Sequence, residues 1–149
     1  MNYSTPDLTQ HPPRSPRARL GGYVLLPRCL DKCRASLAGK NGDYHYACPL
    51  DQRFLQFTGI HPDKLKAEVA KGLSDGEVLA WIKANAQERS DAEIAQWSAY
   101  AEQSTPMDNE SREYFNGLVA AAKAAQREDI RGWFDLLDVD DYVSFGGKS

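Results

Sequence analysis

The sequence has no apolar run that approaches the about 20 residues needed to cross a lipid bilayer. Its first thirteen residues contain Asp7 and three prolines, and they lack the apolar stretch of a secretory signal peptide. We therefore expect a soluble, cytoplasmic protein with no membrane partner. The 42% of hydrophobic and 26% of charged residues are ordinary for a globular protein, and 149 residues suffice for one domain with a sizeable core.

Cysteine is scarce, with Cys29, Cys33 and Cys48 as the three in the chain. The odd number and the missing export signal indicate reduced thiols. Cys29 and Cys33 lie four residues apart, and His45 and Cys48 follow after a turn, so these four side chains could converge on a metal ion. However, the sequence lacks the C-x2-C knuckle typical of structural zinc sites, and Cys33 falls on a leucine-rich helix face. We interpret the cysteines as apolar packing residues and predict no metal, no disulfide, no cofactor and no cysteine nucleophile.

Other chemical signatures are also missing. Gly21-Gly22 follows no strand and precedes no G-K-[ST], so this pair is not a phosphate-binding loop. Four aspartates near the C-terminus lack the glycine and the spacing of a calcium loop, and we interpret them as a solvated helix end: Asp135, Asp138, Asp140 and Asp141. No set of catalytic residues emerges, so the sequence leaves open whether the protein is an enzyme.

Long alternation of apolar and polar residues is absent as well, which argues against an extensive sheet. Helical spacing is present instead, and we predict a mainly α fold: a compact, multi-helix single domain with an extended N-terminal arm. The predicted boundaries are a Pro/Arg-rich arm over 1–19, a helical domain over 20–145 and a frayed tail over 146–149.

The first helix is predicted to begin at Gly21-Gly22 and to run to about Ala38, with Pro27 in its first turn and Gly39 at its end. Its apolar face contains Leu26, Leu30, Cys33 and Leu37. A short extended piece is expected over 43–47. Later helices should begin at Pro49 and Pro62, and the last two contain Phe115, Leu118, Val119 and Ala122, then Trp133, Phe134, Leu136 and Leu137.

Two segments share the pattern S-D-x-E-[VI]-x-x-W, one starting at Ser74 and the other at Ser90. Each places a serine at the N-cap and a glutamate three residues later, at Glu77 and Glu93. This is the capping box that begins many helices. We therefore predict two helices with the same start signal rather than a duplicated site.

Charge is unevenly distributed along the chain. The net charge of −3 divides into +5 over residues 1–40 and −8 over residues 41–149. Such asymmetry can mark a nucleic-acid-binding arm. Because the whole chain is acidic and no long basic helix face appears, we expect the basic segment to lie against its own acidic body, and a nucleic-acid partner is not expected.

The clearest candidate site is a cluster of basic groups near the first helix. Arginine forks suit carboxylate or phosphate, so these groups could bind a small anion. The candidate ligand-binding residues are Arg14, Arg17, Arg28, Asp31, Lys32 and His45. The competing interpretation, which we favour, is a structural ion-pair network that ties the arm to the body through Asp31, Asp43, Asp51 and the acidic C-terminal segment.

The block RSPRARLGGYVLLPRCLDKCRASLAGKNGDYHYACPLDQRFL, followed by SDGEVLAWI, resembles a family of small bacterial proteins known only as a domain of unknown function. The resemblance covers most of the chain. It implies a bacterial, stand-alone, mainly helical protein, and it implies no activity, cofactor or catalytic residue.

The sequence therefore supports two hypotheses on function. The first is a non-enzymatic binding or interaction module, whose partner could be another protein, because no catalytic constellation is present. The second is an enzyme or a sensor that acts on a small phosphate- or carboxylate-bearing ligand at the Arg/Lys/His cluster. The sequence indicates no oligomeric state.

Overall fold

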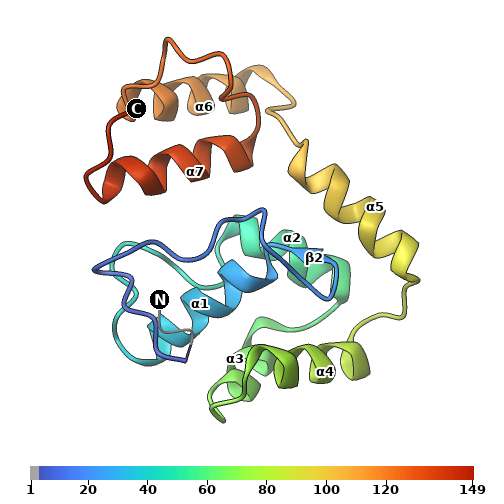
Figure 1. Cartoon of the computed structure of the whole chain (residues 1–149). Coiled ribbons are helices and arrows are strands. Elements are labelled where there is room, and N and C mark those ends of the chain that lie inside the picture. The colour runs from blue at the N-terminus through green and yellow to red at the C-terminus, as the bar shows by residue number, and fades with distance from the viewer. Residues whose placement is uncertain (1–3) are drawn as a thin grey trace.

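The computed structural model describes residues 4–149 and confirms the mainly α fold (Figure 1). Within those residues one short hairpin and seven helices follow one another along the chain. In order they are β1 (Arg19–Leu20), β2 (Tyr23–Val24), α1 (Leu26–Leu37), α2 (Pro49–Thr58), α3 (Pro62–Val69), α4 (Asp75–Asn85), α5 (Asp91–Glu102), α6 (Asn109–Ala121) and α7 (Trp133–Ser144). No helix in the described part is long and apolar enough to span a membrane.

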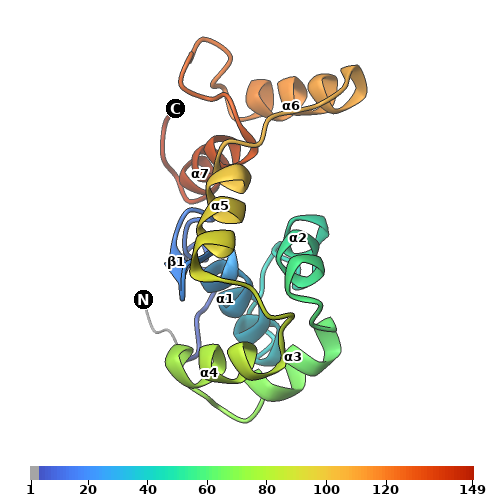
Figure 2. The ribbon, with the colours of Figure 1, turned by 90° about the vertical axis from the view of Figure 1, so that its right-hand side faces the viewer.

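Helix α1 is the centre of the molecule, with α2 beside it, α3 and α4 below it and the α6–α7 pair above it (Figures 1 and 2). Every residue from Leu26 to Ala35 is buried, so the helix is covered all round. A helix covered all round is usually apolar throughout. This one carries Arg28, Asp31, Lys32 and Arg34 into the interior, and the rest of the fold must provide partners for these charges.

The predicted start of the first helix at Gly21-Gly22 is wrong. These two glycines have φ angles of 59° and 86° and form the turn of the β1–β2 hairpin, in which Leu20 pairs with Tyr23. Their left-handed backbone cannot continue into a right-handed helix. The helix begins at Leu26, with Pro27 in its first turn as expected, and its last leucine, Leu37, is 43% exposed rather than part of the core.

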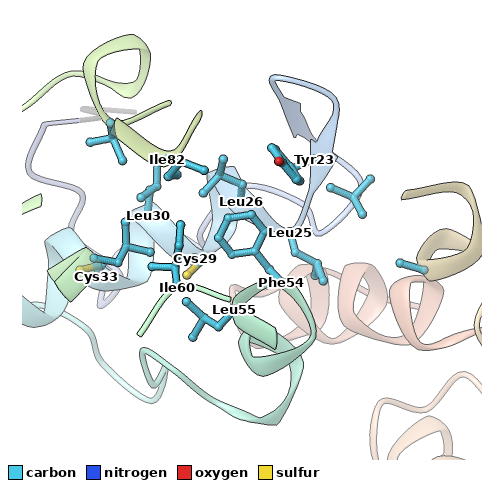
Figure 3. Close-up of a cluster of buried hydrophobic side chains, with 14 of the residues drawn as sticks. Tyr23, Leu25, Leu26, Cys29, Leu30, Cys33, Phe54, Leu55, Ile60 and Ile82 are labelled. Carbon is cyan, nitrogen blue, oxygen red and sulfur yellow. The ribbon is translucent and has the colours of Figure 1, made fainter. Parts of the chain in front are cut away.

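The main core packs around the first turns of α1 (Figure 3). Phe54 from α2 is fully buried and its ring meets that of Tyr23 edge to face at 5.4 Å. Burial of a side chain such as Phe54 contributes about 1.5–3 kcal/mol. Phe57 and Trp97 stack at 4.6 Å on the outer side of the same cluster. These aromatic contacts fix α2 and α5 against the hairpin.

Local start and stop signals were predicted correctly for the middle helices. Both capping boxes are present, with Ser74 and Ser90 each accepting from the backbone of the glutamate three residues on. Proline occupies the first turn of α2 and of α3, and Gly59 ends α2 with a φ of 70°. The extended piece expected over 43–47 is instead a series of turns that contains Ala47 at a φ of 59°.

Helices α6 and α7 share a second, smaller core formed by Phe115, Val119, Leu136 and their neighbours. Leu118, predicted on the buried face of α6, is 38% exposed. The hairpin of these two helices lies beside α1 with α7 facing it (Figure 1). Phe134 of α7 is fully buried in the main core and so joins the two parts.

The N-terminal arm lies along the body. Leu8 is 1% exposed, and its backbone N–H donates to the carbonyl of Lys40 at 2.9 Å. Three of the arm's prolines are buried as well: Pro6, Pro13 and Pro16. The expectation that Tyr3 is buried falls outside the described residues. At the other end, the hydroxyl of Ser149 donates to the carbonyl of Ala122, and fraying of the tail stays a prediction, as do the domain boundaries.

Candidate functional site

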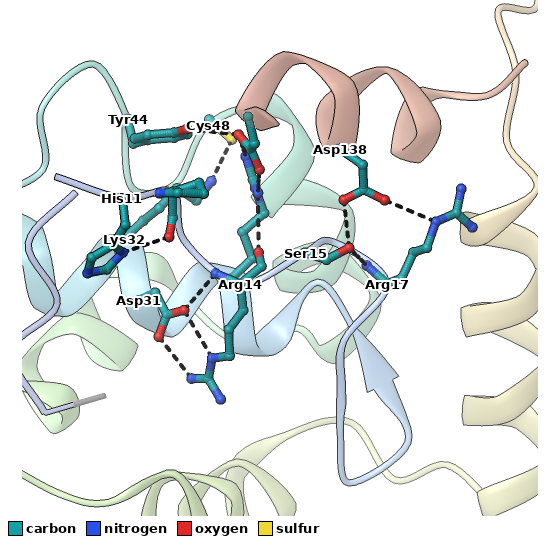
Figure 4. A network of polar contacts seen from close by, with 12 residues as sticks. His11, Arg14, Ser15, Arg17, Asp31, Lys32, Tyr44, Cys48 and Asp138 are labelled. Atoms are coloured by element: carbon teal, nitrogen blue, oxygen red, sulfur yellow. Dashed lines mark hydrogen bonds and ion pairs between the residues drawn. The ribbon is translucent and has the colours of Figure 1, made fainter. Parts of the chain in front are cut away.

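The four charged residues of α1 each form an ion pair with a different segment of the chain, and Figure 4 shows the pair of Asp31 with Arg14. The partners come from the arm, from α2, from α4 and from α7. The pairs are Asp31 with Arg14 at 2.9 Å, Lys32 with Asp51 at 2.9 Å, Arg34 with Asp75 at 2.6 Å and Arg28 with Asp141 at 2.7 Å. α1 is therefore the hub of an internal ion-pair network. Of the acidic partners expected from the sequence, Asp31, Asp51 and Asp141 take part, whereas Asp43 forms no ion pair within residues 4–149.

Arg28 is held by a two-pronged contact with α7. Its guanidinium donates to both oxygens of Asp141 at 2.7 and 3.2 Å and to the carbonyl of Arg14 at 3.2 Å. Burial opposes the charge of Arg28, but the hydrogen bonds and the charge of Asp141 outweigh it and raise the pKa of Arg28. The hydroxyl of Tyr44 also donates to Asp141, at 2.8 Å, and burial together with this contact raises the pKa of Tyr44.

Lys32 lies one turn further along α1, in contact with the start of α2. Its ammonium group is 2.9 Å from Asp51 and donates to the thiol of Cys48 at 3.2 Å. The second oxygen of Asp51 accepts from the backbone of Ala47 at 2.9 Å. This contact holds Ala47 in the left-handed conformation, which disfavours a residue with a Cβ, and so fixes the turn that leads into α2.

A cleft opens beside these groups, between α1 and the C-terminal helices. It has a volume of about 680 Å³ and includes three of the candidate residues, Arg28, Lys32 and His45. The carboxylates that pair with the two cations, Asp141 and Asp51, are not part of its wall. Arg28 and Lys32 are each 3% exposed, so they border the cleft on its buried side, and their counter-ions lie outside its wall.

The cleft continues into an apolar groove of about 460 Å³ between α2 and the α6–α7 hairpin. The groove contains Leu118, Trp133 and Leu136, and five residues belong to both parts: Cys48, Leu50, Tyr114, Leu137 and Asp140. Tyr114 is 64% exposed. The combined site thus offers charged groups at one end and an apolar surface at the other.

Two further carboxylates line the cleft. Asp43 comes from the loop before α2, and Asp140 comes from α7. Within residues 4–149 neither takes part in a hydrogen bond or an ion pair. Burial and the neighbouring charge of Asp141 raise the pKa of Asp140, while Arg28 acts in the opposite direction.

The other three candidate residues lie elsewhere. Arg14 and Asp31 belong to the inner network, where Arg14 also contacts Asp75 at 2.7 Å. Burial raises the pKa of Asp75, but the hydrogen bonds of Arg14 and Arg34 overcome this and lower it. Arg17 contacts Asp135 and Asp138 of α7 beside a separate groove of about 360 Å³. The structure therefore divides the predicted cluster between three places.

The sequence interpretation of the C-terminal aspartates as a solvated helix end is wrong for Asp141, which is buried against Arg28. A signal was available, because Asp141 follows Phe134 by seven residues and Leu137 by four, and so falls on the apolar face of its helix. No local sequence pattern predicts that Asp140 and Tyr114 line the cleft. Both residues are exposed, and they reach the cleft because α7 and α6 pack near α1.

The thiols differ in access to the cleft. Cys29 and Cys33 are fully buried in the main core, and burial raises the pKa of both, that of Cys33 to about 12. Cys48 is half-buried in the wall of the cleft. All three cysteines are free. Among the described residues, no group of three or more His, Cys, Asp or Glu side chains could hold a metal ion.

The chain resembles a known family over most of its length. A family model described as "Domain of unknown function (DUF5069)" matches residues 10–143. This range includes α1, all four of its ion pairs and most of the residues that line the cleft. No curated protein matches the chain.

Proposed function

The chain therefore belongs to the DUF5069 family, and we propose that it is a non-catalytic binding protein whose ligand, a small amphipathic carboxylate, occupies the cleft beside α1. The proposal joins the two hypotheses from the sequence, a binding module and an anion site. It includes a bacterial cytoplasm as the setting, which the odd number of cysteines supports.

The observation that carries the proposal is the position of Arg28 and Lys32 in the wall of the cleft. These cations lie one helical turn apart on α1, and both line the cleft while their own carboxylates do not. A cation held from behind by a carboxylate keeps a fixed position and does not have to be ordered when the ligand arrives. Arg28 uses three of its five N–H groups within the protein, so others remain for a ligand carboxylate.

The apolar groove supports the second half of the proposal. Small-molecule sites are typically clefts of about 300–1,000 Å³ with mainly apolar walls and a few polar groups that orient the ligand. Leu50, Leu118 and Leu137 provide such a wall beside the charged end. A carboxylate with a short hydrocarbon chain would place its head at Arg28 and Lys32 and its chain along these leucines.

The competing explanation is that the charges of α1 only stabilise the fold. The two explanations are separated by calorimetric titration with hexanoate, with 1-hexanol as the uncharged control of equal length. We expect saturable binding of hexanoate with a millimolar or lower Kd, and clearly weaker binding of hexanol. Absence of hexanoate binding up to about 10 mM, where even about −4 kcal/mol would be detected, would refute the proposal.

A matched pair of variants locates the binding. Tyr114→Ala removes an exposed ring from the cleft, and Tyr100→Ala removes an equally exposed ring from α5, outside it. Loss of an aromatic contact of about 1 kcal/mol should weaken hexanoate binding about fivefold in the first variant. Equal affinities in the two variants would place the binding elsewhere on the molecule.

A further inference from the structure

The cleft has a feature that a simple anion would leave unused. Asp140 lies at the point where the charged end meets the apolar groove and lines both of them. Asp43 approaches the same end from the loop before α2. Within the described chain these carboxylates have no hydrogen-bond or ion-pair partner, whereas Arg28 and Lys32 each have one.

Asp140 is exposed, and among the described residues it forms no ion pair with any of the charges around it. On its own helix it follows Asp138 and precedes Asp141. It shares the cleft with Arg28, whose charge is matched by Asp141, and with Lys32, whose charge is matched by Asp51. Arg53 on α2 and His45 complete the charged lining. A positive group bound beside Asp140 would relieve the repulsion from Asp141.

The two kinds of charge lie close together. Arg28 is near enough to Asp140 to act on its pKa, and both line the same cleft. An α-amino acid carries its carboxylate and its ammonium group on one carbon atom, so it presents both charges at this short spacing. An apolar side chain on the same carbon would extend into the groove along Leu118 and Trp133.

Building on the proposed function, we infer that the ligand is a zwitterion, an α-amino acid with an apolar side chain, whose carboxylate binds at Arg28 and Lys32 and whose ammonium group binds at Asp140. A plain carboxylate satisfies the cations and leaves Asp140 with an additional negative charge nearby. A plain amine satisfies Asp140 and gains nothing from the cations. The zwitterion matches both groups and the groove.

Three probes with the same six-carbon chain test this inference: hexanoate, hexylamine and norleucine. Titration of the full chain with each probe should show norleucine binding about tenfold more tightly than hexanoate, as expected for one additional charge-assisted hydrogen bond. Hexylamine should be the weakest. The inference is overturned if hexanoate binds as tightly as norleucine, or if hexylamine binds best.

The variant Asp140→Asn tests whether Asp140 binds the ammonium group of the ligand. It should lose the preference for norleucine over hexanoate, while Asp91→Asn, at an exposed aspartate in the first turn of α5, should keep it. A preference retained in Asp140→Asn would overturn the assignment of Asp140. If none of the three probes binds the unaltered protein, the proposed function itself is refuted. This outcome differs from binding without a preference for norleucine, which refutes only the inference of a zwitterionic ligand.

Discussion

Arg28 shows what it means for a single charged residue to be placed in a protein interior. Only 3% of its side chain is exposed, and Asp141, its partner, is 8% exposed. A buried pair of this kind gains little net stability over apolar residues of similar size, because both charges lose their hydration. Breaking such a pair from one side is nevertheless costly, since the remaining charge stays buried without a counter-ion.

The neighbouring aspartates 140 and 141 allow this cost to be measured. We predict that Asp141→Asn lowers the free energy of unfolding by about 3–5 kcal/mol, because it leaves Arg28 buried without its counter-charge. Asp140→Asn, one residue away and exposed, should stay within about 0.5 kcal/mol of the unaltered protein. Urea unfolding at neutral pH measures both. Similar values for the two variants would show that the Arg28–Asp141 pair does not have the buried character described above.

At the scale of single helices, local chemistry decides where each element begins and ends. α4 and α5 begin at a serine whose hydroxyl accepts from the backbone of the glutamate three residues later, at 3.3 Å for Ser74 and 3.1 Å for Ser90. The glutamates return the contact at 2.8 and 3.2 Å. All four groups are at the surface, so the effect of each cap on stability can be measured without disturbing the core.

We predict that Ser74→Ala and Ser90→Ala each lower the free energy of unfolding by about 1 kcal/mol, the usual effect of removing an N-cap side chain. Ser111→Ala provides the control, because Ser111 lies in the first turn of α6 after the cap residue, Asp108. It should change stability by no more than about 0.5 kcal/mol. Urea melts of the three variants check the prediction, and a cost for Ser111 equal to that of the two caps would contradict it.

The sequence was most informative where a structural rule acts over a few residues. Prolines at helix starts, the glycine after α2 and both capping boxes were placed correctly for this reason. The hairpin was missed because its two strands have two residues each, too few to show alternation. Leu37 and Leu118 have the spacing of core residues, but helix spacing does not tell whether another element covers that part of the face.

The candidate site was less predictable than the fold. The sequence indicated Arg28 and Lys32, because cations on an otherwise leucine-rich helix stand out, and the structure places them in one cleft with His45 from the loop before α2. It could not assign Asp141 to Arg28, since 113 residues separate them and three other aspartates lie within six residues of Asp141. The apolar half of the cleft exists only because α6 and α7 approach α2, and that approach leaves no local signal.

At the scale of the whole molecule, the arm connects parts of the fold that are distant in sequence. Arg14 binds α1 and α4, Ser15 donates to Asp138 of α7 at 2.7 Å, and Arg19 contacts Glu102 of α5 at 3.0 Å. Exposed pairs such as the last contribute about 0–1 kcal/mol each. Leu8 and the buried proline rings provide the part of the attachment that salt does not screen.

We therefore predict that deletion of residues 2–13 lowers the Tm both at low salt and at 1 M NaCl, because burial of Leu8 persists when charges are screened. Charge reversal at Arg17, which is 41% exposed, should instead lower the Tm mainly at low salt. Thermal melts at two salt concentrations separate the two effects. An unchanged Tm after the deletion, with rapid proteolytic removal of the arm from the intact chain, would show that the arm is not bound to the body.

The pairing of α1 with α7 also limits how early the protein can fold during its synthesis on the ribosome. Arg28 is synthesised 113 residues before Asp141, which at about 5–20 residues per second is a delay of about 6–23 seconds. During that interval the hairpin and the helices from α1 to α6 are synthesised, but Asp141, the counter-ion of Arg28, is still absent. Burial of α1 is therefore costly until α7 leaves the exit tunnel, and a chain released before residue 141 lacks the charge that completes its interior. Such a truncated product should therefore be cleaved by proteases more readily than the full chain.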